Sequence, residues 1–188
     1  VTLSRSIEYY VLIDATAFDD TAGNSYAGIS STTALSFTIA DTTDPTLTSS
    51  VPADNATGVS VDTNIVLNFS ESVNTGSGNV TIKKTSDDSV IEAIDVTSGQ
   101  LSGSGSAQIT VNPSVTLDSS TEYYVLIDAT AFDDFSGNSY AGISSTTALS
   151  FTIADTTNPT LTSSVPADNA TGVSVDTNIV LNFSESVN

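Results

Sequence analysis

Apolar and polar residues alternate along much of the chain, in short runs that are separated by clusters of turn-forming residues. In residues 64–70 the apolar side chains of Ile65, Leu67 and Phe69 fall on one face of an extended segment. A period of two is typical of half-buried strands, and no stretch shows a convincing helical period. The pattern predicts strands at residues 46–51, 64–70, 79–84, 89–96, 106–112, 121–129 and 148–154.

The same pattern occurs more than once, because residues 1–74 align without a gap with residues 115–188 at a constant offset of 114. Six positions differ, namely Ser4/Asp118, Arg5/Ser119, Ile7/Thr121, Thr21/Phe135, Ala22/Ser136 and Asp44/Asn158. Such dense identity indicates tandem repeats of 114 residues. We therefore expect the C-terminal part of one repeat in residues 1–40, a complete repeat in residues 41–154, and the N-terminal part of the next in residues 155–188. Each is called a unit below.

Seven short strands in one unit predict an all-β fold, specifically a seven-stranded immunoglobulin-like β-sandwich. Either Tyr123 or Tyr124 could form the tyrosine corner that stands at the start of the sixth strand of such folds. A jelly roll is the alternative all-β arrangement.

Composition narrows the possible functions. The chain has no Cys, Met, Trp or His, which excludes disulfides, Cys/His zinc sites and a Ser-His-Asp triad, so we predict no enzymatic activity. Three cationic residues stand against 22 carboxylates, for a formal charge of -19, and this charge repels nucleic acid. No run is apolar enough to insert into a membrane.

Several motifs of the complete unit resemble those of a known family. They are "DTTDP" (41–45), "PADNATGV" (52–59), "LNFSESV" (67–73) and "DFSGN" (134–138), and together they span the unit. In these motifs the chain is similar to the bacterial Ig-like repeat found in S-layer-associated proteins and large surface adhesins. The resemblance implies an extracellular location at the cell surface, a role as stalk or scaffold, and no catalysis.

Acidic residues gather in the linker and loops that an immunoglobulin topology places at one pole. We predict a metal site there, with Asp41 and Asp44 from the linker, Glu71 from the loop after the second strand, and Asp133, Asp134 and Asn138 from the loop after the sixth. Asp155 and Glu185 are the corresponding residues of the following unit. Hard oxygen ligands without nitrogen or sulfur favour Ca²⁺. The alternative is a solvated polar turn in which Gly137 takes a positive φ.

These observations predict a structural stalk or filament segment of a repetitive, adhesin-like surface protein, in which Ca²⁺ rigidifies the domain junctions. The alternative is a module whose loops bind a glycan or a protein ligand. The expected partners are neighbouring identical repeats, with head-to-tail filaments as one arrangement. The incomplete units at both ends would be completed either by strand exchange between chains or by the adjoining parts of a continuous array.

Overall fold

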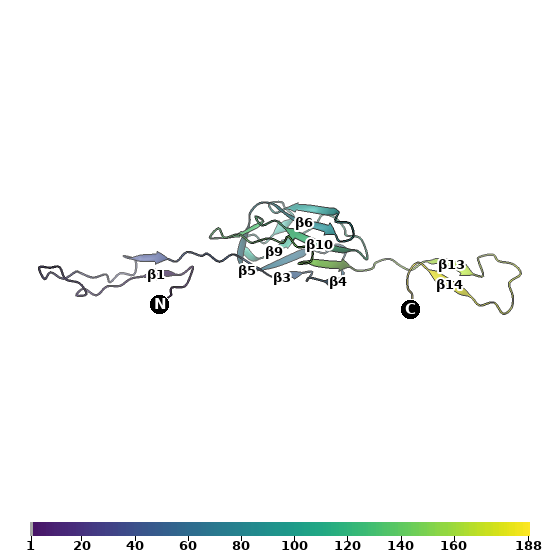
Figure 1. Ribbon diagram of the computed structural model, residues 1–188, viewed down its shortest axis with the longest axis horizontal. Coiled ribbons are helices and arrows are strands. Elements are labelled where there is room, and N and C mark those ends of the chain that lie inside the picture. The colour runs from purple at the N-terminus through teal and green to yellow at the C-terminus, as the bar shows by residue number, and fades with distance from the viewer. Residues whose placement is uncertain (1) are drawn as a thin grey trace.

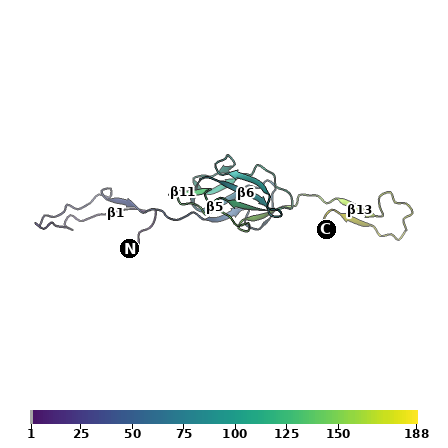
Figure 2. The ribbon, with the colours of Figure 1, turned by 45° about the horizontal axis from the view of Figure 1, so that its top comes forward.

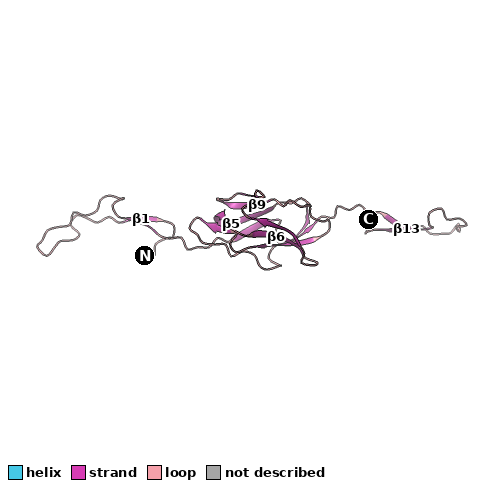
Figure 3. Ribbon diagram, turned by 90° about the horizontal axis from the view of Figure 1, so that it is seen from above, coloured by secondary structure: helices cyan, strands magenta, loops and turns pink. Residues whose placement is uncertain are grey.

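The computed structural model describes residues 2–188, and their regular secondary structure consists of strands (Figure 3). No helix in this range is long and apolar enough to cross a membrane. A sandwich formed by the middle of the chain is flanked by a small two-stranded sheet on either side (Figure 1).

Two five-stranded sheets make up the sandwich. The first has the order β4 (Ala56–Val59), β12 (Ser150–Ile153), β10 (Glu122–Ile127), β6 (Asn79–Lys84) and β7 (Val90–Asp95). The second has the order β11 (Phe132–Asp134), β5 (Ile65–Thr75), β9 (Ser106–Val111) and β8 (Leu101–Ser102), and β3 (Leu47–Val51) also pairs with β5. All pairings are antiparallel except that of β4 with β12.

The core lies between the two sheets and follows from the alternation in the sequence. Ile65, Leu67 and Phe69 of β5 are buried, and they belong to one apolar cluster with Val125 of β10 and Phe151 of β12. Burial of a large apolar side chain contributes about 1.5–3 kcal/mol, so this inward row holds the sheets together.

A tyrosine corner is present, as the sequence suggests. Tyr123 is 1% exposed, and its hydroxyl accepts a hydrogen bond of 2.9 Å from the backbone N–H of Asp118. The preceding unit repeats the contact, since the Tyr9 hydroxyl accepts from the N–H of Ser4 at 2.8 Å. The corner therefore forms from local sequence in both copies.

The flanking sheets reproduce parts of the sandwich. β1 (Glu8–Tyr10) pairs with β2 (Ser36–Thr38) in the register of β10 with β12, and β13 (Leu161–Val165) pairs with β14 (Val180–Phe183) in the register of β3 with β5. Figure 2 again shows both small sheets beside the sandwich rather than within it. Their apolar residues are consequently more exposed: Phe37 is 42% exposed, whereas its counterpart Phe151 is 1% exposed.

The predicted all-β fold is confirmed, and all seven predicted strands of the complete unit are present, with changes of detail. The described residues contain three further short strands in the sandwich, β4, β8 and β11. The position predicted for Glu71 was wrong, because this residue lies inside β5 rather than in the loop that follows it. Likewise, Asp133 and Asp134 belong to strand β11 and not to a free loop.

Candidate metal centre at the junction of two units

The arrangement of β5 and its neighbours leaves a gap in one edge of the second sheet. β3 pairs with β5 from Val66 to Phe69, and β11 pairs with it from Val73 to Thr75. Glu71 lies between these two stretches, at an odd-numbered position in line with the buried Phe69 and Val73. Its carboxylate therefore starts from the inward row of the strand, at a place where none of the strands within residues 2–188 pairs with β5 on this edge.

Two other carboxylates meet Glu71 at this gap. Asp41 comes from the linker that leads into β3, and Asp134 is the last residue of β11. One carboxylate oxygen from each of the three residues lies within 4.8 Å of the others. Asp134 is buried and the other two are half-buried, so the cluster is shielded in part from water. Phe69 lies beneath this region, with its ring centroid 5.3 Å from that of Phe132 and 5.2 Å from that of Tyr140.

Asp134 is held in place by the turn that follows it. Its Oδ1 accepts the backbone N–H groups of Ser136 and Asn138, both at 2.8 Å, and its Oδ2 accepts the Asn138 amide at 2.7 Å. Gly137 completes the turn at φ +88°, a value that favours glycine. Burial alone would raise the pKa of Asp134, but the hydrogen bonds from Asn138 and the turn lower it below the usual value. Asp134 is thus fixed as an anion.

The turn of the preceding unit has the same construction without a sandwich around it. Asp20, the counterpart of Asp134, accepts from the N–H groups of Ala22 and Asn24 and from the Asn24 side chain. The geometry is therefore encoded by the local sequence "D-x-x-G-N".

The pKa of Glu71 is shifted in the opposite direction from that of Asp134. Burial raises the pKa of Glu71, and repulsion from Asp134, Asp41 and Asp44 raises it further. Its ionised form is destabilised by its surroundings, and a bound cation would relieve this repulsion.

Asp41 connects the cluster with the preceding unit. Its Oδ2 accepts a hydrogen bond of 2.8 Å from the Ser6 hydroxyl, and its Oδ1 accepts the N–H of Thr43 at 3.0 Å. These hydrogen bonds, the bond from Thr43 first, lower the pKa of Asp41. The Asn138 amide also approaches the backbone carbonyl of Asp41 at 3.4 Å. One residue therefore contacts both the turn of one unit and the sandwich of the next.

The remaining residues predicted for the site have different positions. Asp44 is exposed and close enough to raise the pKa of Glu71. Asn138 supports Asp134 through its amide nitrogen. Asp133 lies in β11 between the buried Phe132 and Asp134, and it accepts a hydrogen bond from the Ser139 hydroxyl. Because side chains alternate along a strand, Asp133 points away from the three clustered carboxylates.

Asp155 and Glu185 are the counterparts of Asp41 and Glu71, two of the three clustered carboxylates. Burial raises the pKa of Glu185, as does repulsion from Asp155, and Glu185 Oε1 is a buried atom without a hydrogen-bond partner within residues 2–188. Asp155 accepts hydrogen bonds from Ser119 at 3.2 Å and from the N–H of Thr157 at 2.9 Å. The position equivalent to Asp134 falls beyond residue 188.

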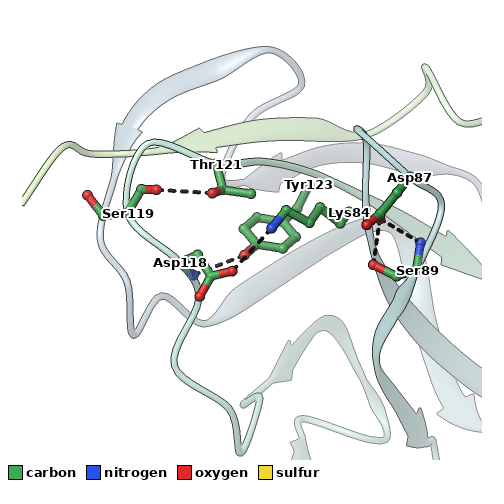
Figure 4. A network of polar contacts seen from close by, with 7 residues as sticks. All are labelled: Lys84, Asp87, Ser89, Asp118, Ser119, Thr121 and Tyr123. Atoms are coloured by element: carbon green, nitrogen blue, oxygen red, sulfur yellow. Dashed lines mark hydrogen bonds and ion pairs between the residues drawn. The ribbon is translucent and has the colours of Figure 1, made fainter.

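The pole from which the next linker leaves has a separate polar network (Figure 4). Lys84 and Asp118 form an ion pair of 3.3 Å, and Tyr123 accepts from the N–H of Asp118 in the same group. Thr121 donates to the carbonyl of Ser119, which fixes the turn against which the linker residue Asp155 rests.

The chemistry of the acidic cluster suits a hard cation. Three carboxylates offer up to six oxygens, and Ca²⁺ takes six to eight oxygen ligands, with water supplying the rest. The sequence pattern identified Asp41, Glu71 and Asp134 but missed Ser6 and Thr43. Ser6 has a counterpart in Ser120, but no pattern in the sequence connects Ser6 with a linker residue 35 positions away.

Comparison with known proteins agrees with the fold. The family model described as the bacterial Ig-like domain matches residues 41–153 and again residues 155–188. A solved structure with some similarity is the crystal structure of the S-layer protein rSbsC, at 18% identity and a TM-score of 0.39, over 63% of this chain and 15% of that one. No curated protein matches the chain. The family model covers well over half of the residues, and the chain therefore belongs to the bacterial Ig-like domain family.

Proposed function

We propose that this chain is part of the stalk of a bacterial cell-surface protein, in which successive Ig-like units add length and Ca²⁺ stiffens the junctions between them. Bacterial Ig-like domains are non-enzymatic surface domains, and this supports a structural role outside the cell. A formal charge of -19 keeps such a stalk soluble, yet it also requires compensation wherever carboxylates converge.

The position of Asp41 is the observation that carries the proposal. Its carboxylate accepts a hydrogen bond from Ser6 of the preceding unit. One of its oxygens also lies within 4.8 Å of a carboxylate oxygen of Glu71 and of Asp134 in the following unit. A cation held by all three residues would join the linker to the sandwich and remove the freedom of the linker to bend there. Without the cation, the carboxylates repel one another and favour separation of the linker from the gap.

Calorimetric titration of Ca²⁺ into the full chain tests this proposal. We expect one principal site with a dissociation constant of about 10⁻⁴–10⁻³ M, the range of extracellular modules. Glu71→Gln should weaken binding at least about tenfold, because it removes one of three charged ligands.

The matched control is Glu185→Gln, which makes the same change in the copy that lacks the third carboxylate. This variant should leave the principal site unchanged. Equal calcium binding by the wild-type chain and by Glu71→Gln would show that the cluster of Asp41, Glu71 and Asp134 is not the calcium site.

The alternative role as a ligand-binding module has less support within residues 2–188. Three surface hollows have volumes of about 240, 250 and 300 Å³, at or below the lower limit of small-molecule sites. The first lies beside Lys84 and Glu122, next to the turn of Asp118 and Ser119 and at the pole opposite the acidic cluster. A stalk role therefore remains the function that the geometry supports best.

A further inference from the structure

The complete unit attaches one of its first strands directly to its last strand, and the two run in the same direction. β4 pairs with β12 in parallel, with Val59 in register with Ile153. Every other strand pairing within residues 2–188 is antiparallel. The segment by which the chain enters the unit is thus hydrogen-bonded to the segment by which it leaves.

Tension on the chain loads this parallel pair along its length. The chain enters the sandwich on one side and leaves it on the other (Figure 1). Pulling the two ends apart draws β4 backwards and β12 forwards along their common direction. The hydrogen bonds between the two strands then carry the load together, and they must break together before the strands can slide. A pair that is pulled open from one end loses its hydrogen bonds one after another.

Further hydrogen bonds reinforce the pair at both ends. At one end the Asn55 N–H donates to the carbonyl of Ser150 at 2.8 Å, and at the other the Ala154 N–H donates to the carbonyl of Val59 at 2.8 Å. Oδ1 of Asp54 accepts the Ser150 N–H at 2.9 Å and the Ser150 hydroxyl at 3.2 Å. Ser150 is buried, and hydrogen bonds to a charged group are stronger than those between neutral groups.

The contact between Asp54 and Ser150 depends on the assembled sandwich. It joins residues that are 96 positions apart in the chain. Residues 170–173 repeat the sequence of β4 but are not a strand, and the position equivalent to Ser150 in their unit falls beyond residue 188. The parallel pair is therefore a feature of the whole unit and not of a local turn.

We infer that the β4–β12 pair, together with the Asp54 carboxylate, is the mechanical clamp of the unit, which holds the entering and leaving segments together under tension and sets the force at which the sandwich unfolds. The use of this clamp under load rests on the proposed stalk function. Its strength is independent of Ca²⁺, because the clamp contains none of the clustered carboxylates.

Glu92 of β7 makes a contact of the same chemistry outside the loaded path. Its Oε2 accepts the Ser114 N–H at 3.0 Å, and its Oε1 accepts the Ser114 hydroxyl at 2.6 Å. β7 is the edge strand at the other end of the sheet from β4, and Ser114 lies between β9 and β10. Neither segment adjoins the place where the chain enters or leaves the sandwich, so Glu92 provides a matched control.

Stretching the full chain from its two ends at constant force, in chelator, tests the inference. The complete unit is recognised by its length, because residues 41–154 extend to at most about 400 Å. Asp54→Ala should unfold about tenfold faster than the wild type at the same force, since it weakens the contacts that break before the barrier. Glu92→Ala should also lower the free energy of unfolding in urea, but it should change the unfolding rate under force by less than about twofold.

The direction of pulling provides a second measurement that leaves the clamp unchanged. The chain has no Cys, so Asp62→Cys and Thr156→Cys together supply two unique attachment points. Both positions are exposed, and both follow the same end of the parallel pair. Pulling there opens the pair from one end, and the complete unit should unfold at a lower force than when the chain is pulled from its termini.

Equal unfolding rates of Asp54→Ala and the wild type under force would overturn the inference, and so would an equal acceleration by Glu92→Ala. Equal unfolding forces in the two pulling directions would overturn it as well. The calcium titration of the wild-type chain is a separate result. If the clamp variants behave as expected but the chain binds no Ca²⁺, the clamp stands and the calcium function fails. If the chain binds Ca²⁺ but the variants have no effect under force, the clamp fails and the calcium function stands.

Discussion

The carboxylate of Glu71 starts from the inward row of a strand and faces three other acidic residues. Its folded-state pKa is raised, so the folded protein holds this proton more tightly than the unfolded chain does. The associated stability is present at low pH and is lost as the pH rises through the folded pKa. The folded-state pKa values of Asp41 and Asp134 are lowered. These two residues therefore contribute stability above their unfolded pKa, and this stability is lost as the pH falls through the folded pKa.

Replacement of Glu71 by Gln should therefore stabilise the complete unit in the absence of metal. At pH 7 in chelator we expect a gain of about 0.5 kcal/mol, a modest value because the site is only half-buried. The gain should disappear below about pH 4, where Glu71 is protonated in both states. Urea unfolding at pH 7 and pH 3.5 measures both values, and a loss of stability at pH 7 would contradict the electrostatic account.

The side chains of this site could be predicted by type but only partly by placement. Asp41, Glu71 and Asp134 were identified because carboxylates in linker and loops gather at one pole of an immunoglobulin topology. The opposite directions of Asp133 and Asp134 could not be predicted, since "FDD" does not show the alternation of a strand until it pairs with β5. The hydrogen bond from Ser6 also lay beyond reach, because it joins residues 35 positions apart across a junction.

At the scale of elements, the tyrosine corner ties the start of β10 to the turn before it. Tyr123→Phe removes a hydroxyl that accepts a hydrogen bond in a buried position, and this should cost about 1 kcal/mol of unfolding free energy. Tyr9→Phe makes the same change in the preceding unit, where the strand has no sandwich around it, and it should leave the unfolding of the complete unit unchanged. An unchanged unfolding free energy in Tyr123→Phe would show that the corner stabilises only local structure.

The strands with a clear alternation of apolar and polar residues could be predicted from sequence, and the strands without it could not. β5, β6 and β12 contain clear alternation, because their inward side chains fill the core and their outward side chains meet water. β4 has the sequence "ATGV" and β8 only "LS", and these segments become strands through pairing with β12 and β9. Edge strands of this kind depend on the neighbouring strand more than on their own residues.

At the scale of the whole molecule, each linker is held by the turn of the unit that precedes it. Ser6 contacts Asp41 at the first junction, and Ser119 contacts Asp155 at the second. The linker is therefore fixed to the preceding unit by hydrogen bonds. The bending that is still possible takes place between the linker and the following sandwich. A cation bound by Asp41, Glu71 and Asp134 acts at that remaining point.

Thermal unfolding of the full chain in 10 mM Ca²⁺ and in excess chelator tests this claim most directly, with NaCl added to equalise the ionic strength. The signal of the buried tyrosines Tyr123 and Tyr124 reports on the complete unit. If 10 mM is about 100 times the dissociation constant, the account predicts a rise in Tm of about 5–10 °C. Identical Tm values in the two conditions would mean that the carboxylates at the junction bind no calcium, and the account of an ion-stiffened stalk would be contradicted.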